Sequence, residues 1–227
     1  MSGRTVDRAG QREGLRERKK RLMRQQLSDT ATEMFLQRGF DAVRVTEIAE
    51  ACGVSEKTVF NYFPTKESLL LDRFDTTLTA LRTTLIDPTR SPVESALRIL
   101  DAELTGLTSY LDTQADPIRA TVRIARFREL IHSTPALRAH QRTGLDRLIA
   151  AAAEILAERA GLDADDPEPR IAATALLGLW QIQFGGLRRY VDGVRTPAEV
   201  RAAVSADVHR AARLLDTGLA SFAVGSR

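Results

Sequence analysis

Residues 45–66 read VTEIAEACGVSEKTVFNYFPTK, and this stretch decides the fold. Its first half carries apolar residues three or four positions apart, a spacing that puts them on one face of a short helix. They are Val45, Ile48, Ala49 and Cys52. Gly53 predicts the end of this helix, because glycine readily adopts the left-handed conformation that closes many helices. The first half therefore predicts a short amphipathic helix followed by a tight turn.

The second half of the stretch predicts another short helix. Ser55 suits the position before its first turn, where a hydroxyl can accept a backbone N–H. Val59 and Phe63 are predicted to face the core. The outward face carries Glu56, Lys57, Phe60 and Asn61. Two short helices joined this way predict a helix-turn-helix, whose second helix enters the major groove of DNA. A pair of short helices that does not bind DNA can show the same pattern, so the flanking sequence is needed to distinguish the two.

The flanks extend the helical pattern on both sides. Residues 18–38 predict a longer helix that Gly39 ends, with one apolar face made of Leu27, Ala31, Met34 and Phe35. After the second short helix, Thr65 is predicted to precede a fourth helix that begins near Ser68 and joins the two parts of the chain rigidly.

With these flanks, the chain resembles the TetR family of bacterial transcription regulators. The resemblance rests on residues 31–70, ATEMFLQRGFDAVRVTEIAEACGVSEKTVFNYFPTKESLL, in which the spacing of three helices matches the family. It implies a dimeric DNA-binding repressor that a small ligand releases from its operator. The family often has Thr where this chain has Arg44, Tyr at the position of Phe60 and His at that of Tyr62. The base preference of a relative therefore does not carry over.

We expect the DNA contacts to come from the two short helices and their edges. Lys57 suits a guanine edge or the backbone, Asn61 an adenine or a phosphate, and Phe60 a thymine methyl group. Lys66 suits a phosphate. The full set of expected DNA-binding residues is Arg44, Thr46, Ser55, Glu56, Lys57, Thr58, Phe60, Asn61, Tyr62 and Lys66.

Positive charge is concentrated at the start of the 227-residue chain. Residues 1–24 contain nine Arg or Lys against three Asp or Glu, and all four lysines lie within the first 70 residues, although the net charge of the whole chain is only +3. We interpret residues 1–17 as a basic flexible arm, and we expect the basic stretch, foremost Arg18 to Arg24, to contact phosphates or the minor groove. The alternative is a solvated leader that only aids solubility.

Cysteine content and hydropathy favour a cytoplasmic protein. Cys52 is the single cysteine and is predicted to be a small buried side chain, so an intramolecular disulfide is excluded. The beginning of the chain does not resemble a signal peptide. The longest apolar run, residues 172–180, is too short to span a membrane.

The remaining two thirds of the chain predict helices only, many of them preceded by a proline that breaks the pattern. The predicted spans are 68–86, 92–111, 117–132, 135–160, 167–191 and 197–222. With the first three helices, this predicts an all-α protein of about nine helices. We expect residues 18–70 to form the DNA-binding domain and residues 71–225 an effector-binding and dimerisation domain.

The last two predicted helices are candidates for a homodimer interface. Residues 167–191 are apolar nearly all round, which predicts burial on more than one side. Residues 197–222 carry a stripe made of Val200, Val204, Val208, Ala211, Leu215, Leu219 and Phe222. Such a pair suits a four-helix interface across a two-fold axis, as the resemblance also implies. The alternative is that both helices only complete the core of a monomer.

The resemblance further implies an effector cavity among these helices. The candidate ligand-binding residues are Tyr110, Arg123, Phe127, Trp180 and Phe184. Plain core packing is the alternative for each of them. Arg119, Arg123 and Arg126 share one helix, and an Arg on its inner face would favour an anionic effector; the sequence leaves that face open. The three histidines lack metal-ligand spacing and no nucleophile or phosphate-binding motif occurs, so we expect a non-enzyme without cofactor or metal.

The sequence therefore predicts a sequence-specific transcription regulator with three kinds of partner: double-stranded DNA, a small-molecule effector and a second copy of itself. A repressor released from a palindromic operator by its effector is the favoured hypothesis. Two alternatives stay open, a ligand-dependent activator and a helical small-molecule-binding protein with an inert DNA module.

Overall fold

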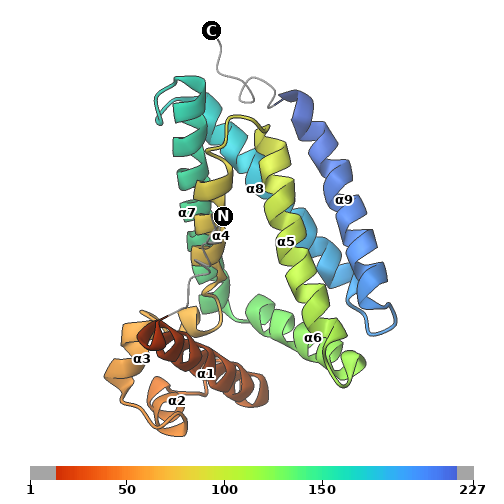
Figure 1. The fold of residues 1–227 in the computed structure, drawn as a ribbon. Coiled ribbons are helices and arrows are strands. Elements are labelled where there is room, and N and C mark those ends of the chain that lie inside the picture. The colour runs from red at the N-terminus through yellow and green to blue at the C-terminus, as the bar shows by residue number, and fades with distance from the viewer. Residues whose placement is uncertain (1–13, 219–227) are drawn as a thin grey trace, which may run out of the picture. The chain divides into compact units, whose positions relative to one another are not determined.

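A computed structural model describes residues 14–218 of the chain, and these residues form nine α-helices, one short 3-10 helix and no strand. The all-α prediction is confirmed. The chain divides into two compact units, one up to Leu70 and the other from Leu71 (Figure 1). Each helix among the described residues is too short or too polar to cross a membrane.

The first unit is built around one long helix, α1 (Leu15–Arg38). Two short helices, α2 (Val45–Ala51) and α3 (Glu56–Tyr62), and the 3-10 helix η1 (Glu67–Leu69) complete it. Their apolar faces meet in a core whose side chains are fully buried: Leu27, Ala31, Phe35, Ile48, Val59 and Phe63. The helix α1 begins three residues before the predicted start, so residues 15–17 of the predicted arm are helical. Residues 1–13 of that arm lie outside the described residues.

The predicted start of a helix near Ser68 is wrong, because η1 ends at Leu69 and α4 (Arg73–Thr84) begins only later. The Ser28 hydroxyl donates to the Leu69 carbonyl over 2.9 Å, and the Ser68 hydroxyl donates to the Thr65 carbonyl over 2.6 Å. Leu69 is almost fully buried in the first unit. A side chain of α1 therefore takes the carbonyl that a continuous helix would need at this position.

The second unit is a helical bundle in which five consecutive helices begin with proline, a residue suited to the first helical position because it has no N–H to satisfy. They are α5 (Pro92–Asp112), α6 (Pro117–Ser133), α7 (Pro135–Ala160), α8 (Pro167–Tyr190) and α9 (Pro197–Gly218). Figure 1 shows α6 lying across the end of α5. The core of this unit includes Leu100, Leu104, Leu156, Leu176, Trp180 and Val204.

The apolar stripe of α9 packs inside its own chain. Val200, Val204 and Val208 are buried in the core cluster that α5 and α8 also enter. Gly186 of α8 faces α9, since an added Cβ there would lie 3.4 Å from the Val204 side chain. The stripe therefore indicates packing within one chain and no longer argues for a dimer. Leu219 and Phe222, which extend it in the sequence, lie outside the described residues.

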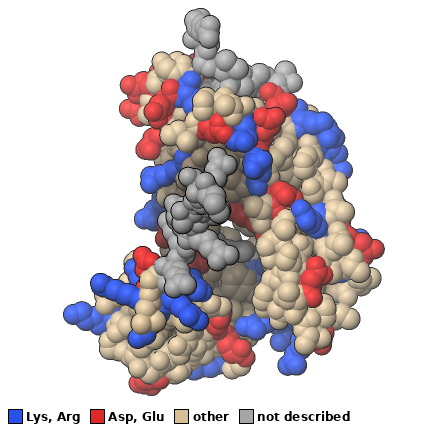
Figure 2. Space-filling model, viewed as in Figure 1, with Lys and Arg blue, Asp and Glu red and all other residues tan. Residues whose placement is uncertain are grey.

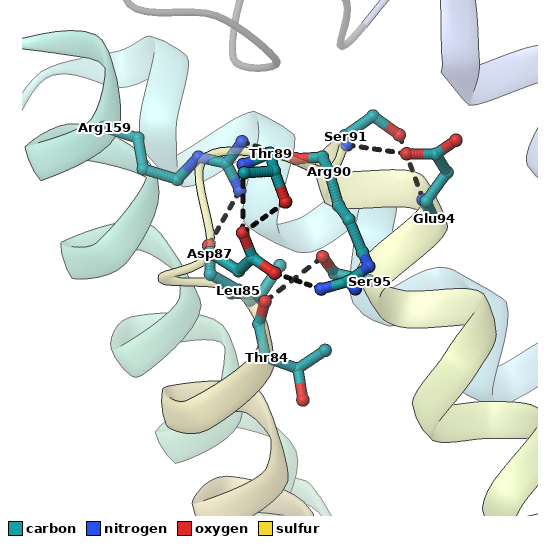
Figure 3. A network of polar contacts seen from close by, with 9 residues as sticks. All are labelled: Thr84, Leu85, Asp87, Thr89, Arg90, Ser91, Glu94, Ser95 and Arg159. Carbon is teal, nitrogen blue, oxygen red and sulfur yellow. Dashed lines mark hydrogen bonds and ion pairs between the residues drawn. The ribbon is translucent and has the colours of Figure 1, made fainter.

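A polar network ties the α4–α5 connection to the end of α7 (Figure 3). Ser91 and Glu94 form a capping box: the Ser91 hydroxyl accepts the Glu94 N–H over 3.1 Å, and Glu94 accepts the Ser91 N–H over 2.9 Å. Arg159 of α7 donates to the carbonyls of Leu85, over 2.7 Å, and Arg90, over 2.8 Å. One guanidinium thereby holds the end of α4 and the approach to α5.

Candidate nucleic-acid interface

The turn between α2 and α3 has the geometry that its glycine predicts. Gly53 has φ +68°, in the left-handed region. The N–H of Gly53 donates to the Glu50 carbonyl over 3.1 Å, and the N–H of Val54 donates to the Ala49 carbonyl over 3.0 Å. These bonds satisfy carbonyls that the end of α2 would otherwise leave unpaired. The turn thus sets the angle at which α3 leaves α2.

The start of α2 is held by one carboxylate. Glu47 accepts the Arg44 N–H over 2.8 Å and forms an ion pair with Arg38 of α1 at 2.9 Å. The Arg44 N–H, and then Arg38, lower the pKa of Glu47. The Arg44 side chain itself is 81% exposed, with its Nε 3.8 Å from Glu47. Its guanidinium lies at the edge of α2 and is accessible to a phosphate.

The helix α3 is fixed on one side and exposed on the other. Ser55 caps it, accepting the Thr58 N–H over 3.1 Å, and the Ser55 and Thr58 hydroxyls lie 2.8 Å apart. Val59 on α3 and Phe63, which follows its last residue, are completely buried, as predicted. The outward side chains are all exposed: Glu56, Lys57, Phe60 and Asn61. A 42% exposed Phe60 on this face suits contact with a thymine methyl group.

The far end of α3 is held by a residue that sequence reasoning grouped with the phosphate contacts. Arg24 of α1 donates to the Tyr62 carbonyl over 2.7 Å, and its guanidinium lies 4.4 Å from the centroid of the Phe63 ring. Arg24 therefore braces α3 against α1. No local pattern in the sequence connects the two positions.

Lys66 is also engaged within the first unit. Its Nζ donates to the Phe40 carbonyl over 2.6 Å and lies 4.4 Å from the centroid of the Phe40 ring. Burial lowers the pKa of this amine. A phosphate bound at Lys66 would share the ammonium group with the Phe40 carbonyl.

The other expected DNA contacts differ in their exposure. Thr46 is exposed, while Thr58 and Tyr62 are half-buried. The first turns of α1 add exposed basic side chains: Arg16, Arg18, Lys19, Lys20 and Arg21. Figure 2 shows Lys and Arg side chains gathered over this part of α1. The first unit therefore combines an exposed helix face with nearby positive charge.

The five predicted ligand residues of the second unit differ in burial. Trp180 is 3% exposed, and its indole N–H donates to Glu103 over 3.1 Å. Phe127 is half-buried, whereas Tyr110, Arg123 and Phe184 are exposed. Glu103 was not predicted from the sequence, and its carboxylate also accepts the Thr77 hydroxyl over 2.7 Å. Its position on an otherwise apolar helix face was the signal that could have pointed to it.

The arginines of α6 lie on different faces. Arg119, Arg123 and Arg126 are exposed. Arg128, which was not among the predicted residues, is half-buried and donates to the Phe184 carbonyl of α8.

Comparisons with known proteins agree with this geometry. Residues 27–72 match the model of bacterial regulatory proteins of the tetR family, and residues 110–220 match the model described as the MftR C-terminal domain. The HTH-type transcriptional regulator TcmR of Streptomyces glaucescens is 30% identical over 154 residues, which cover 67% of each chain. The MftR protein of Mycobacterium tuberculosis is 28% identical over 153 residues, covering 67% of this chain and 73% of MftR.

A solved structure shares the fold. NalD of Pseudomonas aeruginosa, the secondary repressor of the MexAB-OprM multidrug efflux pump, aligns with a TM-score of 0.51 and 20% identity, covering 85% of this chain and 97% of NalD. The helix-turn-helix geometry, the family match over it and the identity to TcmR establish the same conclusion: this chain belongs to the TetR family of DNA-binding transcription regulators.

Proposed function

We propose that this protein is a repressor that binds a palindromic operator as a homodimer and leaves it when a small-molecule effector binds. One observation carries the proposal: α3 is fixed by Ser55 at its start and by Arg24 at its end, while its outer face stays exposed. A helix held this rigidly with polar and aromatic side chains facing outward is suited to the major groove.

The exposed side chains of α3 suggest distinct roles in operator recognition. Lys57 would bind a guanine edge, Asn61 an adenine and Phe60 a thymine methyl group. Arg44, with its exposed guanidinium, would bind a phosphate and set the register. In this proposal residues 18–70 read DNA, while residues 71–225 bind the effector and form the dimer.

A dimer follows from what one unit can read. A single short helix contacts few base pairs, whereas two copies related by a two-fold axis read two half-sites about one helical turn, ~34–36 Å, apart. An effector that binds better to a dimer with a different spacing of the two helices would shift the population away from the operator-bound form. The effector needs only a differential affinity of a few kcal/mol for this.

The proposal is tested by selection from a random double-stranded DNA pool at near-physiological salt. We expect an enriched two-fold symmetric motif with half-sites about one turn apart. Retention of DNA without any motif would leave only attraction to phosphates and contradict sequence-specific regulation. The position of the motif relative to the promoter that it controls then separates a repressor from a ligand-dependent activator.

A double substitution, Lys57→Ala with Asn61→Ala, tests the recognition helix itself. Each lost base contact should cost about 1–3 kcal/mol of discrimination, so affinity for the selected motif should fall towards that for scrambled DNA. Arg138→Ala, which removes an exposed positive charge from α7 in the second unit, is the control and should preserve the preference. An unchanged preference in the double variant would favour an inert DNA module.

A further inference from the structure

One cation of the second unit lies on the inner side of its helix. Arg128 is four residues after Ile124 and three before Ile131, so the three share one face of α6. Ile131 is buried, and Ile124 packs against the core cluster. Arg128 is itself half-buried on this apolar stripe, unlike the exposed Arg126 two positions earlier.

The surroundings of Arg128 do not balance its charge. The guanidinium donates to the backbone carbonyl of Phe184 on α8. The charged group that acts on it is another cation, Arg188, one turn after Phe184 along α8. Among residues 14–218, no ion pair with a carboxylate is found for Arg128 or for Arg188. Burial and Arg188 lower the pKa of Arg128 to about 10, which leaves the group charged at neutral pH.

Bracing α6 against α8 accounts for only part of this arrangement. The bond to Phe184 uses one of the five N–H donors that a guanidinium carries. A brace would not require a second cation alongside, and removing a charge from water without a counter-ion is costly. An oxyanion placed between the two guanidinium groups would remove that cost and could form paired charge-assisted hydrogen bonds.

The nearby side chains also suggest the rest of the ligand. The Phe184 side chain, on the residue whose carbonyl Arg128 binds, is 48% exposed. Exposed aromatic surface beside a pair of cations suits a molecule with an apolar body and an anionic end.

We infer that Arg128 and Arg188 bind the anionic group of the effector, and that the effector is therefore an amphiphilic carboxylate or phosphate. The inference rests on the proposed effector function. An anion at Arg128 would share the guanidinium with the Phe184 carbonyl, so it would bind at the link between α6 and α8. Ligand binding at this point could therefore change how the two helices pack.

Trp180 provides the measurement, because it is the only tryptophan of the chain and lies 3% exposed in the same unit. Its fluorescence is followed while the full-length protein is titrated with decanoate, decyl phosphate, decanol and inorganic phosphate. We expect one or both amphiphilic anions to bind more tightly than decanol and than inorganic phosphate. The ratio of decanoate to decyl phosphate affinity identifies which oxyanion the pair prefers.

Two variants assign the effect to the cations. Arg128→Met and Arg188→Gln should each weaken binding of the preferred anion about 10- to 100-fold, the range expected for a lost charge-assisted hydrogen bond. Decanol binding should change little, and it shows that the variants remain folded. Arg126→Met, which removes an exposed charge from the same helix, is the matched control and should keep the affinity of the unsubstituted protein.

Equal binding of decanol and the anions, no binding of any anion, or an equal loss in Arg126→Met would overturn the anion site. Release of the selected operator DNA, measured in parallel, separates this failure from failure of the proposed function. If the unsubstituted protein and Arg128→Met release the operator DNA equally at the same decanoate concentration, the anion site is refuted and control by an effector still holds. If the protein keeps its operator DNA at saturation by every bound probe, control by an effector is refuted and the anion site still holds.

Discussion

At the scale of single residues, the helix-turn-helix depends on one backbone conformation. Gly53 lies at φ +68°, and its N–H and that of Val54 close the end of α2. A Cβ at Gly53 would contact no other atom within 4 Å, so space does not limit this position. The position is limited by backbone conformation, because the left-handed region costs an L-residue free energy.

We therefore expect Gly53→Ala to destabilise the first unit by about 1–2 kcal/mol. Thermal unfolding followed by circular dichroism should show an earlier transition, and affinity for the selected operator should fall with it. Gly106→Ala is the matched control, since Gly106 lies within α5, is exposed and has open space for a Cβ. The control should be neutral or stabilising, because alanine is the better helix former. Equal losses in both variants would refute the conformational argument.

The sequence predicted the outward residues of α3 better than the roles of nearby cations. Ser55, Val59 and Phe63 follow local rules of capping and periodicity, and the structure has them as predicted. Arg24 and Lys66 instead bind carbonyls that are 38 and 26 residues away in the chain. Such partners depend on how helices pack, which a local pattern does not contain.

At the scale of elements, the α4–α5 connection depends on a side chain from another helix. Arg159 donates to the carbonyls of Leu85 and Arg90, and burial lowers the pKa of its guanidinium (Figure 3). We expect Arg159→Met to lower the free energy of unfolding of the second unit by about 2 kcal/mol, since the variant loses charge-assisted bonds and leaves carbonyls unpaired.

Urea unfolding followed by Trp180 fluorescence measures this loss, because Trp180 belongs to the core of the same unit. Arg138→Met changes an exposed arginine of the same helix, α7, and should leave the midpoint unchanged. A urea midpoint for Arg159→Met equal to that of the control would show that the two hydrogen bonds of Arg159 add nothing to stability.

Helix boundaries were predictable where proline or a capping box marked them. The starts of α5 and α9 follow Ser91-Pro92 and Thr196-Pro197, and both agree with the structure. The predicted start of α4 was wrong, because the chain is not α-helical where Ser28, far away in the sequence, binds the Leu69 carbonyl.

The close packing of α4 against α7 was equally unpredictable from the sequence: an added Cβ on Gly144 of α7 would lie 2.6 Å from the Phe74 ring of α4. That need for glycine appears only when the two helices are placed side by side.

At the scale of the whole molecule, a homodimer needs an exposed apolar surface, and α8 provides one that α9 does not cover. The stripe of α9 packs in the core of its own chain, whereas the outward face of α8 carries exposed apolar side chains. Ile171 is 68% and Ile182 is 41% exposed on that face, and an added Cβ at Gly178 or Gly185 would meet nothing within 4 Å. Small residues between exposed isoleucines would allow a second α8 to approach closely.

If α8 forms the homodimer interface, Ile182→Glu should dissociate the protein. Sedimentation equilibrium should give twice the chain mass of 25.1 kDa for the unsubstituted protein and the chain mass for the variant. A charge buried at the interface without a partner is strongly unfavourable, and the loss of bivalent binding should also weaken operator affinity. Val122→Glu, an equivalent change at a 46% exposed position of α6, should remain dimeric. A dimeric Ile182→Glu variant with an unchanged melting temperature would place the interface elsewhere on the surface, and operator recognition by two copies would then need a different geometry from the one that α8 offers.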